Sequence, residues 1–208
     1  MFEFDLPENN NSIIKVIGVG GGGGNAVNHM FKQGIKGVDF IVCNTDQQAL
    51  DKSPVPLKLV LGATLTKGRG AGSLPEVGRN AAIETIEELK AILSKNTEMV
   101  FITAGLGGGT GTGAAPIIAQ AAKDLGILTV GIVTIPFQFE GKKRIAQANE
   151  GLEALKKNVD TLLVISNDKL RMIHGNAKVT EAFEHADDIL TTAAKGIAEI
   201  ITTTLQIN

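Results

Sequence analysis

The chain has 208 residues, 43% of them hydrophobic, with 20 basic and 22 acidic side chains. That length can bury one substantial core and the composition is that of an ordinary globular protein, so we expect one compact domain. The nearly balanced charge excludes the strongly basic character of a nucleic-acid-binding protein. A single cysteine, Cys43, excludes an internal disulfide and a cysteine-based metal cluster, and we interpret it as a buried strand residue.

The first dozen residues, MFEFDLPENNNS, are polar and acidic, and we interpret 1–12 as a flexible segment. They have neither the basic start nor the apolar stretch of a secretory signal, which predicts a cytoplasmic protein. No apolar run approaches the roughly 20 residues that span a bilayer, which predicts no direct membrane insertion.

Short apolar runs alternate with longer amphipathic segments along the chain. The runs that predict buried strands are 13–19, 38–43, 99–104, 128–134 and 161–166. A further run at 57–61 follows two prolines, which favours an edge strand or an irregular position. Segments 76–95 and 142–157 predict crossover helices. Repeated strand–helix units predict an α/β fold with a doubly wound, mainly parallel sheet and helices on both faces.

The segment 178–204 carries apolar residues at the spacing of one helix face, which predicts a core helix about 40 Å long. Only 205–208 follow it, without a capping glycine. We therefore interpret this helix as a connector to further sequence.

Glycine is unusually frequent and falls into two runs, 18–24 and 105–113. Gly18, Gly20 and Gly23 fit G-x-G-x-x-G between a strand and a helix, the pattern of a dinucleotide-binding turn. Glycine lets the backbone approach a phosphate, and the helix that follows adds N–H donors and a positive dipole end. The alternative is a tight strand-to-helix turn without a ligand.

The second run predicts a similar loop that leads into a helix at about 114–125. Two such loops can hold one polyphosphate at the carboxyl ends of parallel strands. Neither loop contains the G-K-[ST] ending that supplies a phosphate-binding lysine. Backbone amides, Mg²⁺ and the hydroxyls of Thr110 and Thr112 are therefore expected to serve instead.

Several motifs in order resemble one family: VIGVGGGGGNAVNHM, NTDQQAL, KGRGAGSLPEVGRNAA, GGGTGTG at 107–113, PFQFEGKKR and NDKL. Together they resemble the tubulin/FtsZ GTPase superfamily, and within it the bacterial cell-division FtsZ proteins, from about residue 13 onward. The resemblance implies a GTP-binding domain at 13–177, then the long helix and the start of a loop at 178–208. It also implies a second domain that this sequence does not contain.

The resemblance also implies a set of nucleotide-binding residues. The set is Gly21, Gly22, Gly23, Gly24, Asn25, Asn44, Ala71, Gly72, Gly109, Thr110, Gly111, Glu140, Arg144, Asn167, Phe183 and Asp187. Within it, 21–25 and 109–111 form the two phosphate loops. Ala71 and Gly72 lie by the terminal phosphate, or alternatively belong to a flexible surface loop. Glu140 and Arg144 lie by the ribose, whereas Lys142 and Lys143 are interpreted as solvated.

The spacing of two residues in the long predicted helix also indicates how a base would be recognised. Phe183 and Asp187 are four residues apart and share one helix face. A carboxylate accepts hydrogen bonds from guanine N1–H and the 2-amino group, whereas the unprotonated N1 of adenine leaves that charge unpaired. Asp187 therefore selects guanine, Phe183 packs on the ring, and Asn167 or Asn25 completes the edge. The alternative is that Asp187 is a surface acid.

In the family, hydrolysis is completed when an acidic loop of one subunit reaches the nucleotide of the next. The sequence ends at Ile207 and Asn208, which match the start of that loop. The resemblance thus implies no catalytic and no metal-ligating side chain in this chain, with GTP or GDP as ligand and Mg²⁺ accompanying GTP. It implies head-to-tail polymerisation with other subunits, a mid-cell division ring, and ring partners reached through C-terminal regions.

Two other functions stay open. The G-x-G-x-x-G pattern is shared with NAD-dependent oxidoreductases, although Asn44 stands where an acid is expected after the second strand. A naturally short, non-catalytic paralogue that binds nucleotide and caps polymer would have the same sequence features.

Overall fold

The computed structural model describes residues 12–174 together with Asp188, Ile189, Thr192 and Gly196. Within that part of the chain, no helix is long and apolar enough to cross a membrane.

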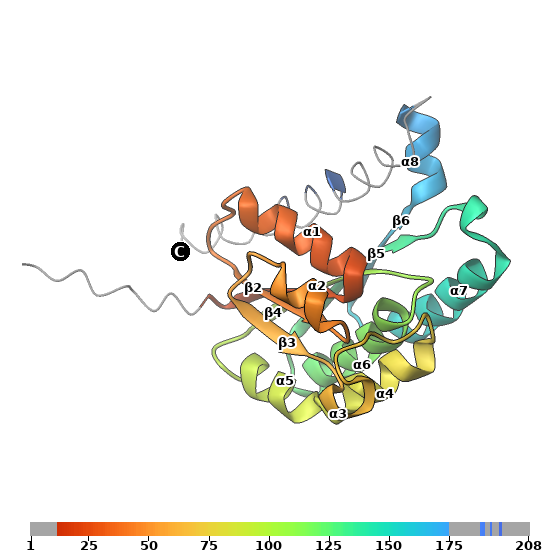
Figure 1. Cartoon of the computed structure of the whole chain (residues 1–208). Helices are drawn as coiled ribbons and strands as arrows, with labels where there is room; N and C mark the ends of the chain where they lie inside the picture. Colours follow the sequence, from red (N-terminus) through yellow and green to blue (C-terminus); the bar gives the residue numbers. More distant parts are fainter. Residues whose placement is uncertain (1–11, 175–187, 190–191, 193–195, 197–208) are drawn as a thin grey trace, which may run out of the picture.

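Six parallel strands form one sheet in the order β3-β2-β1-β4-β5-β6, which confirms the predicted doubly wound α/β fold (Figure 1). The strands are β1 (Ile14–Val19), β2 (Asp39–Asn44), β3 (Leu57–Val60), β4 (Met99–Gly105), β5 (Leu128–Ile135) and β6 (Thr161–Ser166). β3 lies at an edge, as predicted from the prolines before it. Chain order reverses between β1 and β4, which makes this central pair the switch point where ligands bind in such sheets.

Helices cover both faces of the sheet (Figure 1). They are α1 (Gly20–Lys32), α2 (Gln47–Asp51), α3 (Ala63–Thr66), α4 (Pro75–Glu84), α5 (Ile86–Leu93), α6 (Thr110–Asp124), α7 (Lys142–Lys156) and α8 (Asn167–His174), with a 3-10 turn η1 (Gln138–Glu140). Alternate strand residues serve the two faces: Ile17 packs with α6, whereas Val16 packs with α1. Cys43 is buried in β2 as predicted, and burial raises the pKa of its thiol to about 12.

The predicted helix over 76–95 is two helices, because the chain breaks at Thr85 between α4 and α5. The Thr85 hydroxyl donates to the Ala81 carbonyl and accepts from the Gly62 N–H. A backbone amide from outside the helix thus bonds to Thr85, and the chain changes direction there.

The segment after β3 is tied to the segment after β2. Glu84 caps α3, because its carboxylate accepts from the N–H groups of Thr64 and Leu65. Beyond α3, the Gly70 N–H donates to the Thr45 carbonyl at 2.9 Å, and Asp46 forms an antiparallel bridge with Arg69. These contacts hold the GRGAGS loop against the carboxyl end of the sheet.

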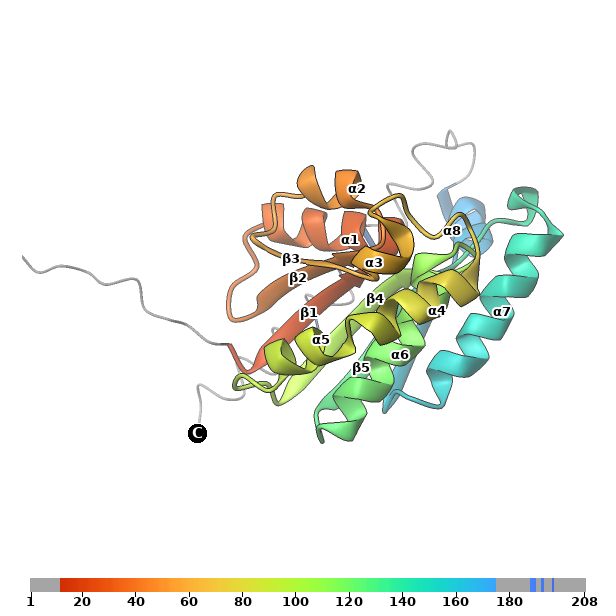
Figure 2. The same ribbon diagram turned by 60° about the horizontal axis from the view of Figure 1, so that its bottom comes forward.

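Glycines allow α4 to lie directly on α6, and Figure 2 shows α6 beside α4 and α7. A Cβ at Gly113 would lie 1.9 Å from the Pro75 carbonyl oxygen, and one at Gly78 would lie 2.4 Å from the Gly109 carbonyl oxygen. Both contacts are with backbone. The first turn of α6 is therefore fixed by α4.

The predicted helix over 178–204 lies largely outside the described residues. Asp188, Ile189, Thr192 and Gly196 are helical. Ile189 packs against the hydrophobic cluster on the α1 face, and Asp188 pairs with His29 of α1 at 3.2 Å.

We expect Gly113→Ala to lower the free energy of unfolding by about 1–3 kcal/mol, because backbone would have to move to admit the methyl group. Alanine's better helix propensity, worth about 1 kcal/mol, offsets part of this loss. Urea denaturation measures the change. Gly24→Ala is the matched control, since Gly24 is also helical but has open space at its Cβ position. A Gly113→Ala protein as stable as the Gly24→Ala protein would contradict the prediction.

We expect Glu84→Gln to destabilise the protein at neutral pH but not in acid. The Thr64 N–H is the main cause that lowers the pKa of the Glu84 carboxyl. Because the pKa is lower in the folded protein, the ionised carboxyl stabilises the fold above the unfolded pKa of about 4.3. This stabilisation is lost as the pH falls through the folded pKa. Denaturation curves of both proteins across this range measure the difference. Glu87→Gln is the control, because Glu87 is exposed and pairs only with Lys90 among described residues. An equal loss of stability in the Glu87→Gln protein would contradict the role of Glu84 as a cap of α3.

Candidate functional site

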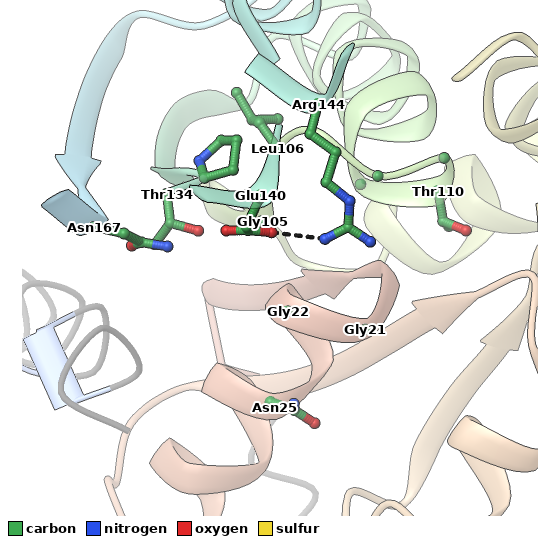
Figure 3. A pocket seen from close by; sticks show the side chains of 14 residues that line it. Gly21, Gly22, Asn25, Gly105, Leu106, Thr110, Thr134, Glu140, Arg144 and Asn167 are labelled. Carbon is green, nitrogen blue, oxygen red and sulfur yellow. Dashed lines mark hydrogen bonds and ion pairs between the residues drawn. The ribbon is translucent and has the colours of Figure 1, made fainter. Parts of the chain in front are cut away.

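A pocket of about 370 Å³ lies at the carboxyl ends of the central strands, between the first turns of α1 and α6 (Figure 3). Its lining residues are Gly21, Gly22, Asn25, Gly105, Leu106, Gly108, Gly109, Thr110, Gly111, Thr134, Pro136, Glu140, Arg144 and Asn167. The pocket is therefore at the switch point between β1 and β4, where the fold predicts a ligand.

Two helices begin at this pocket without side-chain caps. The residue before α1 is Val19 and the residue before α6 is Gly109, and neither makes a side-chain cap. Neither helix has an acidic residue in its first turn. The first N–H groups of each helix lack intrahelical acceptors, and the dipole adds partial positive charge. Both helix ends are thus suited to an anion.

Glycine is required where the two helix starts meet. Gly20 has φ +72°, and a Cβ there would lie 2.8 Å from the Gly111 nitrogen. A Cβ at Gly111 would lie 2.5 Å from the Gly105 carbonyl oxygen. Any larger residue would separate the two termini. The helices begin inside both glycine motifs, four residues earlier than predicted for α6, because the motif residues are themselves the first helical turns.

The two threonines of the second motif face different surroundings. Thr110 lines the pocket, and its hydroxyl oxygen lies 2.6 Å from that of Thr45. Thr112 is buried, and its hydroxyl accepts from the Gly107 N–H at 2.8 Å. Thr112 thus closes the 107–112 turn and does not line the pocket, contrary to its predicted role beside Thr110.

Charged side chains on one wall of the pocket form a pair. Arg144 donates to Glu140 at 2.6 Å, and the second Glu140 oxygen accepts from the Phe137 N–H at 2.9 Å. The Glu140 side chain is 12% exposed and that of Arg144 is 50% exposed. Figure 3 shows this pair between Thr110 and Asn167. Glu140 holds the cation of Arg144 at the pocket while much of that guanidinium stays accessible.

Asn167 closes the other end of the pocket with an unpaired acceptor. It is the first residue of α8, it is 4% exposed, and its Oδ1 has no hydrogen-bond partner among the described residues. A buried polar atom without a partner is unfavourable in the empty protein. Its place in the pocket lining indicates a ligand with a hydrogen-bond donor.

The fold brings most of the predicted site residues to this pocket. Those that line it are Gly21, Gly22, Asn25, Gly109, Thr110, Gly111, Glu140, Arg144 and Asn167. Gly24 and Asn44 line a smaller adjoining cavity of about 40 Å³. Gly23 is buried, where a Cβ would lie 2.2 Å from the Thr103 carbonyl oxygen, so it serves helix–sheet packing.

The remaining predicted residues are placed less directly. Ala71 lies against Gly109, and Gly72 is exposed with φ +57°. Phe183 and Asp187 lie outside the described residues. The lining residues that the predicted set of individual residues does not name are Gly105, Leu106, Gly108, Thr134 and Pro136, although the run 105–113 was predicted as a loop of the site. All of them stand at strand ends or in the two loops that follow β4 and β5, so position after a strand was the available signal.

Comparisons with known proteins agree with this geometry. A profile of the Tubulin/FtsZ family, GTPase domain, matches residues 13–175. The cell division protein FtsZ of Porphyromonas gingivalis is 60% identical over 91% of this chain and 42% of its own length. That of Pseudomonas aeruginosa is 55% identical over 95% of this chain and 51% of its own length. The chain thus spans about half the length of these curated relatives.

Solved structures show the same fold. An empty FtsZ dimer of M. jannaschii is 48% identical, with a TM-score of 0.88 over 91% of this chain and 55% of that one. A GDP-bound monomer of CetZ1 from Haloferax volcanii is 25% identical, with a TM-score of 0.76 over 86% of this chain and 58% of that one. Together with the family profile, these matches establish that the chain belongs to the Tubulin/FtsZ family and carries its GTPase domain.

Proposed function

We propose that this chain binds GTP and GDP in the pocket between α1 and α6. The observation that carries the proposal is the convergence of two uncapped helix N-termini on one cavity. Polyphosphate supplies the acceptors that the exposed N–H groups lack and the negative charge that both dipoles favour. Membership of a GTPase family supports a guanine nucleotide as the source of that polyphosphate.

The arrangement of side chains gives the nucleotide a direction. The phosphates lie at the glycine turns beside Thr110, and the ribose lies at Glu140 and Arg144. The base points toward Asn167, whose Oδ1 has no partner among the described residues and accepts from an N–H of the ring. Asp187, which lies outside the described residues, selects guanine by accepting from N1–H and the 2-amino group. Mg²⁺ would accompany GTP, take phosphate and water oxygens as ligands, and offset phosphate charge.

Hydrolysis needs a group that the described pocket does not supply. Glu140 is the single carboxylate among the described lining residues, and its oxygens already accept from Phe137 and Arg144. It is therefore poorly placed to activate water. We propose that a neighbouring subunit contributes the missing acid in a head-to-tail polymer, and that the isolated chain turns GTP over slowly.

The cellular role follows from the relatives. They are named cell division proteins, and one structural relative is a dimer. We propose a cytoplasmic protein of the mid-cell division ring, whose ring partners bind through regions outside this sequence. The oxidoreductase alternative has no support in the family match. A role as a polymer-capping paralogue predicts nucleotide binding at the same pocket.

Calorimetric titration with GTP and ATP tests the base specificity. We expect saturable binding of GTP, no comparable binding of ATP, and loss of this preference in Asp187→Ala because the carboxylate is removed. Asp188→Ala is the matched control, since the neighbouring carboxylate pairs with His29 and is half exposed. Equal affinity of the unaltered chain for both nucleotides would reject guanine recognition. Phosphate release measured on the same samples should be slow, and rapid release by a monomer would reject the shared-site mechanism.

We expect Arg144→Ala to weaken GTP binding by about tenfold, the scale of one charge-assisted hydrogen bond. The substitution also leaves the Glu140 carboxylate without its cation beside the bound nucleotide. Binding should become less sensitive to salt, because one positive charge at the ligand has been removed. Lys143→Ala removes the same charge from an exposed position on the same helix and outside the pocket lining, so it should bind GTP normally. An equal loss of GTP affinity in both variants would mean that Arg144 acts only through general electrostatic attraction.

A further inference from the structure

Thr45 is a buried residue that sequence reasoning did not assign to the site. It directly follows β2, its side chain is 0% exposed, and it does not line the pocket. Its hydroxyl oxygen lies 2.6 Å from that of Thr110, which is 65 residues away in sequence and does line the pocket. One hydrogen bond therefore joins the loop after β2 to the first turn of α6.

Burial favours Thr45 as the donor in this hydrogen bond. Among the described residues, Thr110 is the one hydrogen-bond partner of the Thr45 hydroxyl. If Thr110 donated, the Thr45 hydrogen would be left buried without an acceptor, which is unfavourable. If Thr45 donates, its buried hydrogen has an acceptor, and the hydroxyl hydrogen of Thr110, which lines the pocket, stays available to a ligand. The second arrangement is favoured on these grounds alone.

Thr45 itself is held in place from its backbone. Its carbonyl accepts from the Gly70 N–H at 2.9 Å and from the Thr66 hydroxyl at 3.3 Å. Both bonds are made to the Thr45 carbonyl and not to its hydroxyl. They hold the backbone of Thr45 in place and leave its hydroxyl available to Thr110. The Thr110 hydroxyl is thus oriented by a rigid neighbour and needs little reorganisation when a ligand binds.

We infer that Thr45 is a positioning residue that holds the Thr110 hydroxyl as a donor to a phosphate oxygen of the bound nucleotide. The inference rests on the proposed function. Thr45 does not touch the ligand and acts through Thr110. Donation from Thr45 also polarises the Thr110 hydroxyl and strengthens the bond it makes in turn.

The test compares GTP affinity by calorimetry in matched variants. Thr45→Val and Thr45→Ala remove the hydroxyl and should weaken binding by about tenfold. Thr45→Ser keeps the hydroxyl and should bind like the unaltered chain. Thr129→Val is the control, because Thr129 is equally buried at the opposite end of the sheet and donates to the Ile127 carbonyl. Its GTP affinity should not change.

A double-mutant cycle separates positioning from general destabilisation. Because Thr45 acts through Thr110, adding Thr45→Val to Thr110→Val should cause no further loss of GTP affinity. Normal binding by Thr45→Val and Thr45→Ala, or full addition of the two losses, would overturn the inference. If Thr45→Val does not fold, the comparison of Thr45→Ala with Thr45→Ser decides. Absence of saturable GTP binding by the unaltered chain marks failure of the proposed function itself, and both proposals then fall.

Discussion

The site depends on two helix N-termini that meet at one point. Both α1 and α6 begin without side-chain caps, so unsatisfied N–H groups and two positive dipole ends lie together. Like partial charges repel, which makes the arrangement unfavourable without an anion. Gly20 and Gly111 permit the close approach, since a Cβ at either would meet backbone. Stability is thus given up locally in favour of anion binding.

The sheet supports this meeting point. β1 and β4 are neighbours, so the helices that follow them begin side by side on opposite faces. The position of α6 is then fixed by α4, because Gly78 and Gly113 allow backbone contact between the two helices. Parallel strands buried on both faces make this platform rigid. The segments after β5 and β6 need only reach inward to complete the walls.

The chemistry of the walls favours holding a ligand over transforming it. Backbone N–H groups, the Arg144 guanidinium, the hydroxyls of Thr110 and Thr134, and the Asn167 amide oxygen, which has no partner among the described residues, are suited to bind and orient a ligand. The one carboxylate in the described lining is engaged by Arg144 and by the Phe137 N–H. Such a pocket suits an enzyme whose reaction is completed from outside it. Under the proposed function, nucleotide binding and subunit association would be linked through a shared site.

The sequence by itself determined the strands, the parallel sheet and the two glycine motifs that line the pocket, because buried apolar runs and clustered glycines are local signals. It also identified Glu140, Arg144 and Asn167, through likeness to a family. Only the tertiary structure decided that Thr112 turns inward while Thr110 lines the pocket, and that the hydroxyls of Thr45 and Thr110 are hydrogen-bonded. It alone placed the break at Thr85, where the Gly62 N–H donates to the hydroxyl. These features depend on hydrogen bonds between residues far apart in the chain, which no local pattern encodes.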